Sequence, residues 1–400
     1  MRARMSTSVL VFLFALLPSI VAAEPFVPHD NDQVLERLPF VPGDSSIRAL
    51  RVRRAALASD PRNIDLAIEA ATDYISTGRI TGDPRFYGYA QAALDPWWTS
   101  ADAPTQILVL RADVKQASHD FHGALRDLNL AIEKEPDNLN AVLTRAIVLQ
   151  VQGRFGEAQN DCARLLDAAR RAPLLQLTAT TCAASVASFS GGATRSFDIL
   201  NTALQRASVA DVQGRDWALT TLADIAARLG RARVADRFFR AALTIEQDAW
   251  LLSAYADFLL AQGRPQEVIE LLRDKTDVDT LLLLLTLAEQ ELDAPSLVEH
   301  VELLRDRFAA SRLRNDQRHL REEARFTLHI LDRPKPALQL ARANWHVQHE
   351  PEDARILLQA ALAADRFKPA EPVLAFLEHS RLEDVRLERL TGRVRAAIVQ

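Results

Sequence analysis

The chain has 400 residues, of which 48% are hydrophobic and 25% charged, so it can bury a sizeable core like an ordinary globular protein. Its formal net charge is −5 and it has no long basic block, which argues against nucleic acid as a partner. Glycine is scarce, at 13 residues, whereas the strong helix formers Ala, Leu, Arg, Glu and Gln dominate. The composition predicts an all-α protein.

The N-terminus has the pattern of a secretory signal peptide over residues 1–23. Arg2 and Arg4 precede an apolar run from Val9 to Val21, which is too short to span a bilayer comfortably. Small residues then lead to an expected cleavage site near Ala23. We therefore expect export to the periplasm or the secreted space. The alternative is an uncleaved signal anchor, which would be the only membrane attachment.

A sequence repeat of 34 residues becomes visible further along the chain. The segment HDFHGALRDL starts at His119, and GRFGEAQNDC starts at Gly153 with the same spacing of its aromatic and small residues. The matched pairs are Phe121 with Phe155, Ala124 with Ala158, and Leu128 with Cys162. A period of this length is typical of stacked helical hairpins.

This pattern resembles the tetratricopeptide repeat (TPR) superfamily. A repeat that starts at Thr105 has the family's small residues at positions 8, 20 and 27, its aromatic at 17 and its proline at 32. These residues are Ala112, Ala124, Ala131, Phe121 and Pro136. Small residues allow two helices to approach closely, and proline ends the second helix. The resemblance implies a right-handed superhelical solenoid of roughly eight helical hairpins.

The register divides the mature chain into three parts. Residues 24–46 are rich in Pro and Asp and are expected to form an extended arm. The solenoid is expected over residues 47–390, with the clearest repeats at 105–172 and 216–275, and a tail or cap over 391–400. Extra residues between repeats predict a longer connection near 207–214. They also predict a stretched turn within the degenerate repeat before Pro96.

The resemblance implies a concave face lined by positions 2, 5, 9 and 12 of each first helix. Tryptophan recurs at position 2, and aspartate recurs at position 9. Aspartate beside an aromatic residue suits a cationic or amide-rich peptide, and the alternative is a solvated face without a ligand. The partner-binding residues that we predict are Gln106, Asp113, Gln116, Asn140, Gln150, Trp217, Asp224, Trp250 and Asp257.

Two cysteines are too few for a disulfide framework. Cys162 falls on the second helix of one repeat and Cys182 on the first helix of the next, and these helices are neighbours in a TPR stack. Two interpretations remain open: a single disulfide in an oxidising compartment, or two separately buried thiols.

Two histidine clusters provide an alternative, metal-handling or enzymatic hypothesis: His119 with His122, and His346 with His349. The register places the first cluster in a turn between helices, where Asp120 is a capping residue. No nucleophile elbow, P-loop, zinc-protease or dinucleotide motif occurs in the sequence.

The main expectation is therefore a non-catalytic scaffold without metal or cofactor, which binds another protein or a peptide in its concave groove. A third hypothesis is an assembly factor that acts through the convex face and the N-terminal arm. Glu322 and Glu323, which lie among arginines, are expected on an ion-paired helix surface.

Overall fold

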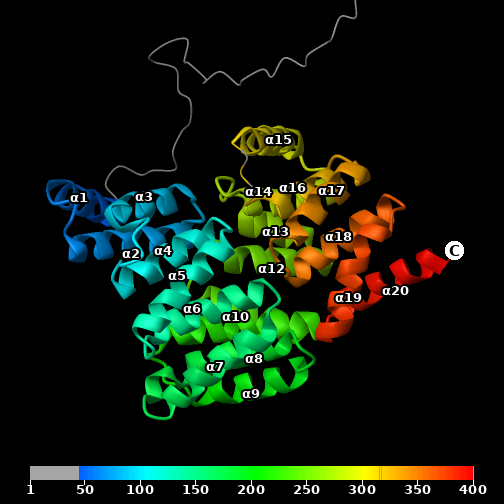
Figure 1. The fold of residues 1–400 in the computed structure, drawn as a ribbon. Helices are drawn as coiled ribbons and strands as arrows, with labels where there is room; N and C mark the ends of the chain where they lie inside the picture. Colours follow the sequence, from blue (N-terminus) through cyan, green and yellow to red (C-terminus); the bar gives the residue numbers. More distant parts are fainter. Residues whose placement is uncertain (1–44, 315, 317, 400) are drawn as a thin grey trace, which may run out of the picture. The chain divides into compact units, whose positions relative to one another are not determined.

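The computed structural model describes residues 45–314, 316 and 318–399, and within these residues every regular element is a helix. Nine helical hairpins follow one another in chain order, from the blue to the red end of Figure 1. The all-α fold and its hairpin architecture are as the sequence predicts. The expected signal peptide (1–23) and nearly all of the arm (24–46) lie outside the described residues.

The hairpins are preceded by α1 (Ser45–Ser59) and followed by α20 (Val385–Val399). Short 3₁₀ turns η1 (Asp95–Trp97), η2 (Pro173–Leu175) and η3 (Lys368–Ala370) lie between helices. The hairpins are α2 (Ile64–Thr81) with α3 (Arg85–Ala93), α4 (Thr105–Ala117) with α5 (Phe121–Lys134), α6 (Leu139–Val151) with α7 (Phe155–Ala169), α8 (Gln176–Ser188) with α9 (Ala193–Arg206), α10 (Val212–Arg228) with α11 (Ala232–Leu243), α12 (Ala249–Ala261) with α13 (Pro265–Leu272), α14 (Asp279–Glu291) with α15 (Leu297–Leu313), α16 (Leu320–His329) with α17 (Pro334–Trp345), and α18 (Pro351–Ala363) with α19 (Glu371–Ser380).

Each hairpin turn contains one residue in the left-handed backbone region, with φ between 49° and 79°. Glycine, aspartate and histidine occupy this position, and they are among the residues that tolerate positive φ best. The turn residues are Gly82, His119, Gly153, Gly191, Gly230, Gly263, Asp293, Asp332 and Asp365. Because one such residue stands in every hairpin turn, the turn residues alone define where each repeat divides into its two helices.

Small residues lie where the two helices of a hairpin pack together. In the α4–α5 hairpin, Ala112, Ala124 and Ala131 are fully buried, as the register predicts. Asp120 accepts a hydrogen bond from the N–H of Gly123 at 2.8 Å and caps α5. A larger side chain at one of these alanines would overpack the contact.

Longer helices, and not longer turns, absorb the extra residues between repeats. The connection expected near 207–214 is only residues 207–211, because Asp211 caps α10 and that helix has 17 residues. The stretched turn expected before Pro96 is likewise only residues 82–84, because α2 has 18 residues. Both sequence predictions of long turns are wrong.

At the C-terminal end, α20 continues without a break past residue 390, the predicted end of the solenoid, and through most of the predicted tail over 391–400. The leucine run in α14 is buried from Leu281 to Leu285. No helix among the described residues is long and apolar enough to cross a membrane.

The turns of α2–α11, the N-terminal half, lie against segments of α12–α20, the C-terminal half. We call this region the turn-edge contact. A β-carbon on Gly82 would lie within 3.0 Å of Ala249 and Val278, and one on Gly191 would lie 3.3 Å from Cβ of Arg381. The turn at Gly230 likewise faces Val385.

The centre of the turn-edge contact is aromatic. A β-carbon on Gly153 would lie 2.7 Å from Cε2 of Phe376, which also packs against Phe155 and Trp345. The backbone N–H of His349 donates to the carbonyl of Val151 at 2.8 Å. The two halves of the solenoid are therefore in direct contact.

Candidate functional site

The predicted partner-binding residues differ widely in exposure. Gln106, Asn140 and Trp250 are exposed, and Asp257 is buried. The other five are half-buried: Asp113, Gln116, Gln150, Trp217 and Asp224. The structure therefore does not present them as one accessible groove surface.

Asp257 is held by three arginines from the C-terminal half. Its carboxylate lies 2.7 Å from Arg325 of α16, 2.8 Å from Arg355 of α18 and 3.5 Å from Arg386 of α20. Glu352, which pairs with Arg355 and Arg386, adds a second carboxylate. Asp257 on α12 thus links three later helices, and an external partner could reach it only by displacing them.

The pKa of Asp257 reflects this environment. Burial alone would raise it, but the three guanidinium groups hold the pKa of this carboxyl below its ordinary value. The group is therefore ionised at neutral pH. We call Asp257, Arg325, Arg355 and Arg386 the Asp257 cluster.

Asp224, one repeat earlier, has a different local partner. Its side chain is 42% exposed and accepts from Nε of Arg228 at 2.9 Å. Arg228 is fully buried, stacks on the ring of Phe189 at 4.5 Å and donates to the hydroxyl of Ser188 at 2.7 Å. Asp224 helps to neutralise a structural arginine, yet part of its surface remains accessible.

A second group of acids, each of them half-buried, lies on α4, on α10 and directly before α12. Desolvation raises the pKa of Asp113 to about 6, opposed by the positive charge of Arg79. Tyr87 lies close enough to both Asp113 and Asp248 for each to raise its pKa, after the larger effect of burial. Asp113 on α4 and Asp248, which directly precedes α12, therefore lie in one electrostatic environment around Tyr87.

Asp216 belongs to the same environment. Desolvation raises its pKa to about 6, with further contributions from Asp248 and Glu246. Its buried Oδ1 has no hydrogen-bond partner among the described residues. Two tryptophans stand beside these acids in the sequence: Trp217, which packs partly on the N-terminal core, and Trp250, which is 56% exposed.

We call Asp113, Asp216, Asp248, Trp217 and Trp250 the acidic surface. Three of its members, Asp113, Trp217 and Trp250, are among the residues predicted from the sequence, whereas Asp216 and Asp248 are not. A signal for the missed residues exists, because an acid stands one or two residues before each recurring tryptophan, in RDW and in DAW.

The histidine clusters do not form a metal centre in the structure. His119 and His349 are in the turn-edge contact, whereas His122 and His346 are exposed. Among the described residues, no group of three or more His, Cys, Asp or Glu side chains is arranged to hold a metal ion.

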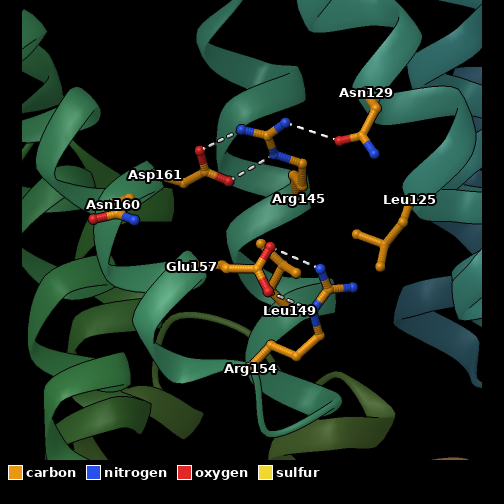
Figure 2. Close-up of a pocket in the computed structure, with 8 residues that line it drawn as sticks. All are labelled: Leu125, Asn129, Arg145, Leu149, Arg154, Glu157, Asn160 and Asp161. Carbon is orange, nitrogen blue, oxygen red and sulfur yellow. Dashed lines mark hydrogen bonds and ion pairs between the residues drawn. The ribbon is translucent and has the colours of Figure 1, made fainter.

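A polar hollow of about 200 Å³ lies between α5, α6 and α7 (Figure 2). Its charges are paired within the wall. Arg145 binds Asp161 at 2.6 and 2.8 Å and Asn129 at 2.9 Å, and Arg154 binds Glu157 at 2.7 Å. These pairs stabilise the hairpin stack and leave no unpaired charge for a ligand.

The preceding repeat contains the equivalent of the Arg145–Asp161 pair. There, Arg111 pairs with Asp127, 34 residues earlier in each case, and both side chains are buried. Nζ of Lys115 adds an ion pair to Asp127 at 2.6 Å. The wall of the hollow is therefore a repeated structural feature.

Cys162 on α7 and Cys182 on α8 are joined in a disulfide, with their Cα atoms 5.6 Å apart. Of the two interpretations that the sequence leaves open, the structure has the bonded one. The bridge links neighbouring hairpins across a separation of 20 residues.

Reduction of this disulfide is expected to lower the free energy of unfolding by about 3 kcal/mol, because a loop of this size is released in the unfolded chain. Urea unfolding with and without dithiothreitol measures the change. The double variant Cys162→Ala/Cys182→Ala is the control and should not respond to the reductant. An equal response of both proteins would contradict the expectation.

Three solved structures are similar to this chain at low sequence identity. A tetratricopeptide repeat protein from Parabacteroides merdae is 17% identical and covers 61% of this chain and 92% of its own, with a TM-score of 0.45. The Rap protein, solved with competence and sporulation factor, is 14% identical over 88% and 94%, with a TM-score of 0.48. The Cut9–Hcn1 structure is 13% identical over 83% and 63%, with a TM-score of 0.47.

No family model matches the sequence, and the search of curated proteins finds no match. The assignment rests on features of the chain itself: paired helices, a left-handed residue in every hairpin turn, and alanines at the helix contacts. By these features, the chain has an all-α solenoid fold of TPR-like helical hairpins.

Proposed function

We propose that the chain is an exported, non-catalytic scaffold that binds a basic segment of another protein at the acidic surface. A solenoid of hairpins offers an extended surface whose exposed residues are free to vary while the alanine contacts keep the fold. The disulfide between Cys162 and Cys182 supports export, because such bonds persist in oxidising compartments.

The observation that carries this proposal is the state of Asp113 and Asp216. Desolvation raises both pKa values to about 6, and Oδ1 of Asp216 has no hydrogen-bond donor in the part of the chain that the structure describes. A poorly solvated carboxylate without a donor destabilises the free protein. A lysine or arginine of a partner would supply the missing charge and donors, and Trp250, two residues after Asp248, offers an exposed apolar contact.

The double variant Asp113→Asn/Asp216→Asn tests the proposal because it should change stability and binding in opposite directions. We expect the free energy of unfolding at pH 7.5 to rise by about 1–2 kcal/mol, since two desolvated charges are removed. Affinity for a fluorescein-labelled peptide of alternating Lys and Leu should fall at least tenfold. A variant with unchanged peptide affinity would contradict the proposal.

The stability gain should depend on pH. Both folded pKa values lie above the ordinary aspartate value, so the folded state binds protons more readily than the unfolded state. The wild-type protein therefore recovers stability as pH falls from about 7 to 4, and its difference from the Asn variant should shrink over that range. Asp198→Asn, in the mostly exposed face of α9, is the matched control for charge removal alone.

Specificity for charge has its own control. A peptide with Glu in place of Lys should bind the wild-type protein at least tenfold more weakly than the Lys peptide. Equal binding of the two peptides would favour apolar association and contradict an acidic recognition surface.

A further inference from the structure

His119 stands in the α4–α5 turn, in a position where it faces the C-terminal half. Its ring stacks on Phe121 with centroids 5.4 Å apart, and its buried Nδ1 has no hydrogen-bond partner among the described residues. The charged groups that act on it come from the start of α16 and the residues just before it. They are Glu322, Arg321, His319 and Arg318.

His349 occupies the corresponding place opposite the next turn, α6–α7. Its ring lies between Trp345 and Phe376, with centroids 4.5 and 5.5 Å away. The backbone of Gln152 forms a hydrogen bond with the ring, but the buried Nδ1 remains without a partner among the residues that the structure describes. His346, on its own segment, is the titratable group that acts on it.

One arginine connects the surroundings of the two rings. Arg321 acts electrostatically on His119 and forms ion pairs with Glu350 at 2.8 Å and Asp353 at 3.4 Å. Glu350 directly follows His349 in the chain. Arg321 therefore links the surroundings of His119 to the segment that follows His349, and a proton on either ring would add a positive charge at this contact.

We propose that the turn-edge contact is an acid-released latch, in which protonation of His119 and His349 separates the α4–α5 and α6–α7 turns from α16–α19. The latch goes beyond the proposed binding function and does not depend on the identity of any partner. Its open state would expose Phe376 and the turn at Gly153, which cover each other in the closed state.

The surroundings of His119 also favour release of the latch at low pH. Burial lowers its pKa to about 4; the negative charge of Glu322 opposes the shift, and the cations of Arg321, His319 and Arg318 reinforce it. Burial also lowers the pKa of His349. Both folded pKa values lie below the ordinary value, so the closed contact has its full stability above pH 6.5 and loses it as pH falls toward 4.

The test needs a local measurement, because Asp113 and Asp216 shift global stability in the opposite direction over the same pH range. Hydrogen exchange followed by mass spectrometry provides it, with rates corrected for the intrinsic effect of pH. We expect the turns at His119 and Gly153 and the start of α16 to exchange at least tenfold faster at pH 5.0 than at pH 7.5. The turn at Gly263, where a β-carbon would meet no atom within 4 Å, should not change.

The variant His119→Asn/His349→Asn should abolish the acid response, because asparagine does not titrate and tolerates the positive φ of residue 119. Its circular dichroism and thermal unfolding at pH 7.5 establish that it is folded. The variant His122→Asn, which changes an exposed histidine close to His119 in the sequence, is the matched control and should behave like the wild type.

Two results would overturn the latch: a wild-type protein without faster exchange at pH 5.0, or a double variant that opens as the wild type does. If the double variant fails to fold, His119→Asn alone decides. It should move the midpoint of release to lower pH, and an unchanged midpoint would contradict the proposal. Unchanged peptide binding by the Asp113→Asn/Asp216→Asn variant would concern the binding proposal alone.

Discussion

Replacement of Asp257 by alanine is expected to lower the free energy of unfolding by about 3 kcal/mol, because it leaves three closely packed guanidinium groups without their shared carboxylate. Glu352 and Asp384 retain their pairing with Arg386 and limit the loss. Urea unfolding measures the change. The effect should be largest in α16, α18 and α20, whose hydrogen exchange should accelerate before that of α4–α9.

Asp167→Ala is the control for this experiment. Asp167 is 69% exposed and lies 3.6 Å from Arg170, so its loss should cost less than about 0.5 kcal/mol. A cost for Asp257→Ala within that same range would mean that the Asp257 cluster does not hold the C-terminal half in solution.

Gly153→Ala is expected to lower the free energy of unfolding by about 3 kcal/mol. The positive φ of this residue contributes roughly 1–2 kcal/mol of that loss. The new methyl group also overpacks the contact with Phe376, which adds roughly 1–3 kcal/mol. The change should combine global destabilisation with faster hydrogen exchange around Phe376, because the methyl group enters the turn-edge contact.

Gly263→Ala separates the two causes. Its φ of 66° resembles the 71° of Gly153, but a β-carbon there would meet no atom within 4 Å. It should lose only the backbone contribution, about 1–2 kcal/mol, with no effect around Phe376. Equal losses in the two variants would contradict the turn-edge contact.

The repeat register was predictable from the sequence because it depends on local chemistry. Alanine marks the places where two helices touch, glycine marks turn residues with positive φ, and proline marks the end of a helix. Each of these features depends on residues only a few positions away in the sequence. The turn at His119 shows this directly, since histidine occupies the same backbone state as glycine in the neighbouring turns. Helix lengths were less predictable, because capping residues such as Asp211 start a helix earlier than the repeat alone suggests.

The candidate site was less predictable because it depends on contacts between distant parts of the chain. The repeat register assigns Asp257 to position 9 as a partner-binding residue, but nothing near it in the sequence indicates the arginines, about 70 to 130 residues away, that bury and pair with it. Glu322 and Glu323 show the same limit. Their arginine-rich surroundings predict an ion-paired surface. The ion pairs are present, Glu322 with Arg321 and Glu323 with Arg312, but both carboxylates are buried and Glu322 faces His119 across the turn-edge contact.

In this structure, α16, α18 and α20 of the same chain cover the face of α12 that carries Asp257. A double-mutant cycle between Asp257→Ala and Arg355→Ala tests it most directly, with the free energy of unfolding measured for all four proteins. We predict a coupling energy of at least about 1 kcal/mol, as expected for residues in contact. Additive losses, within about 0.3 kcal/mol, would contradict the claim and would leave Asp257 free for a partner.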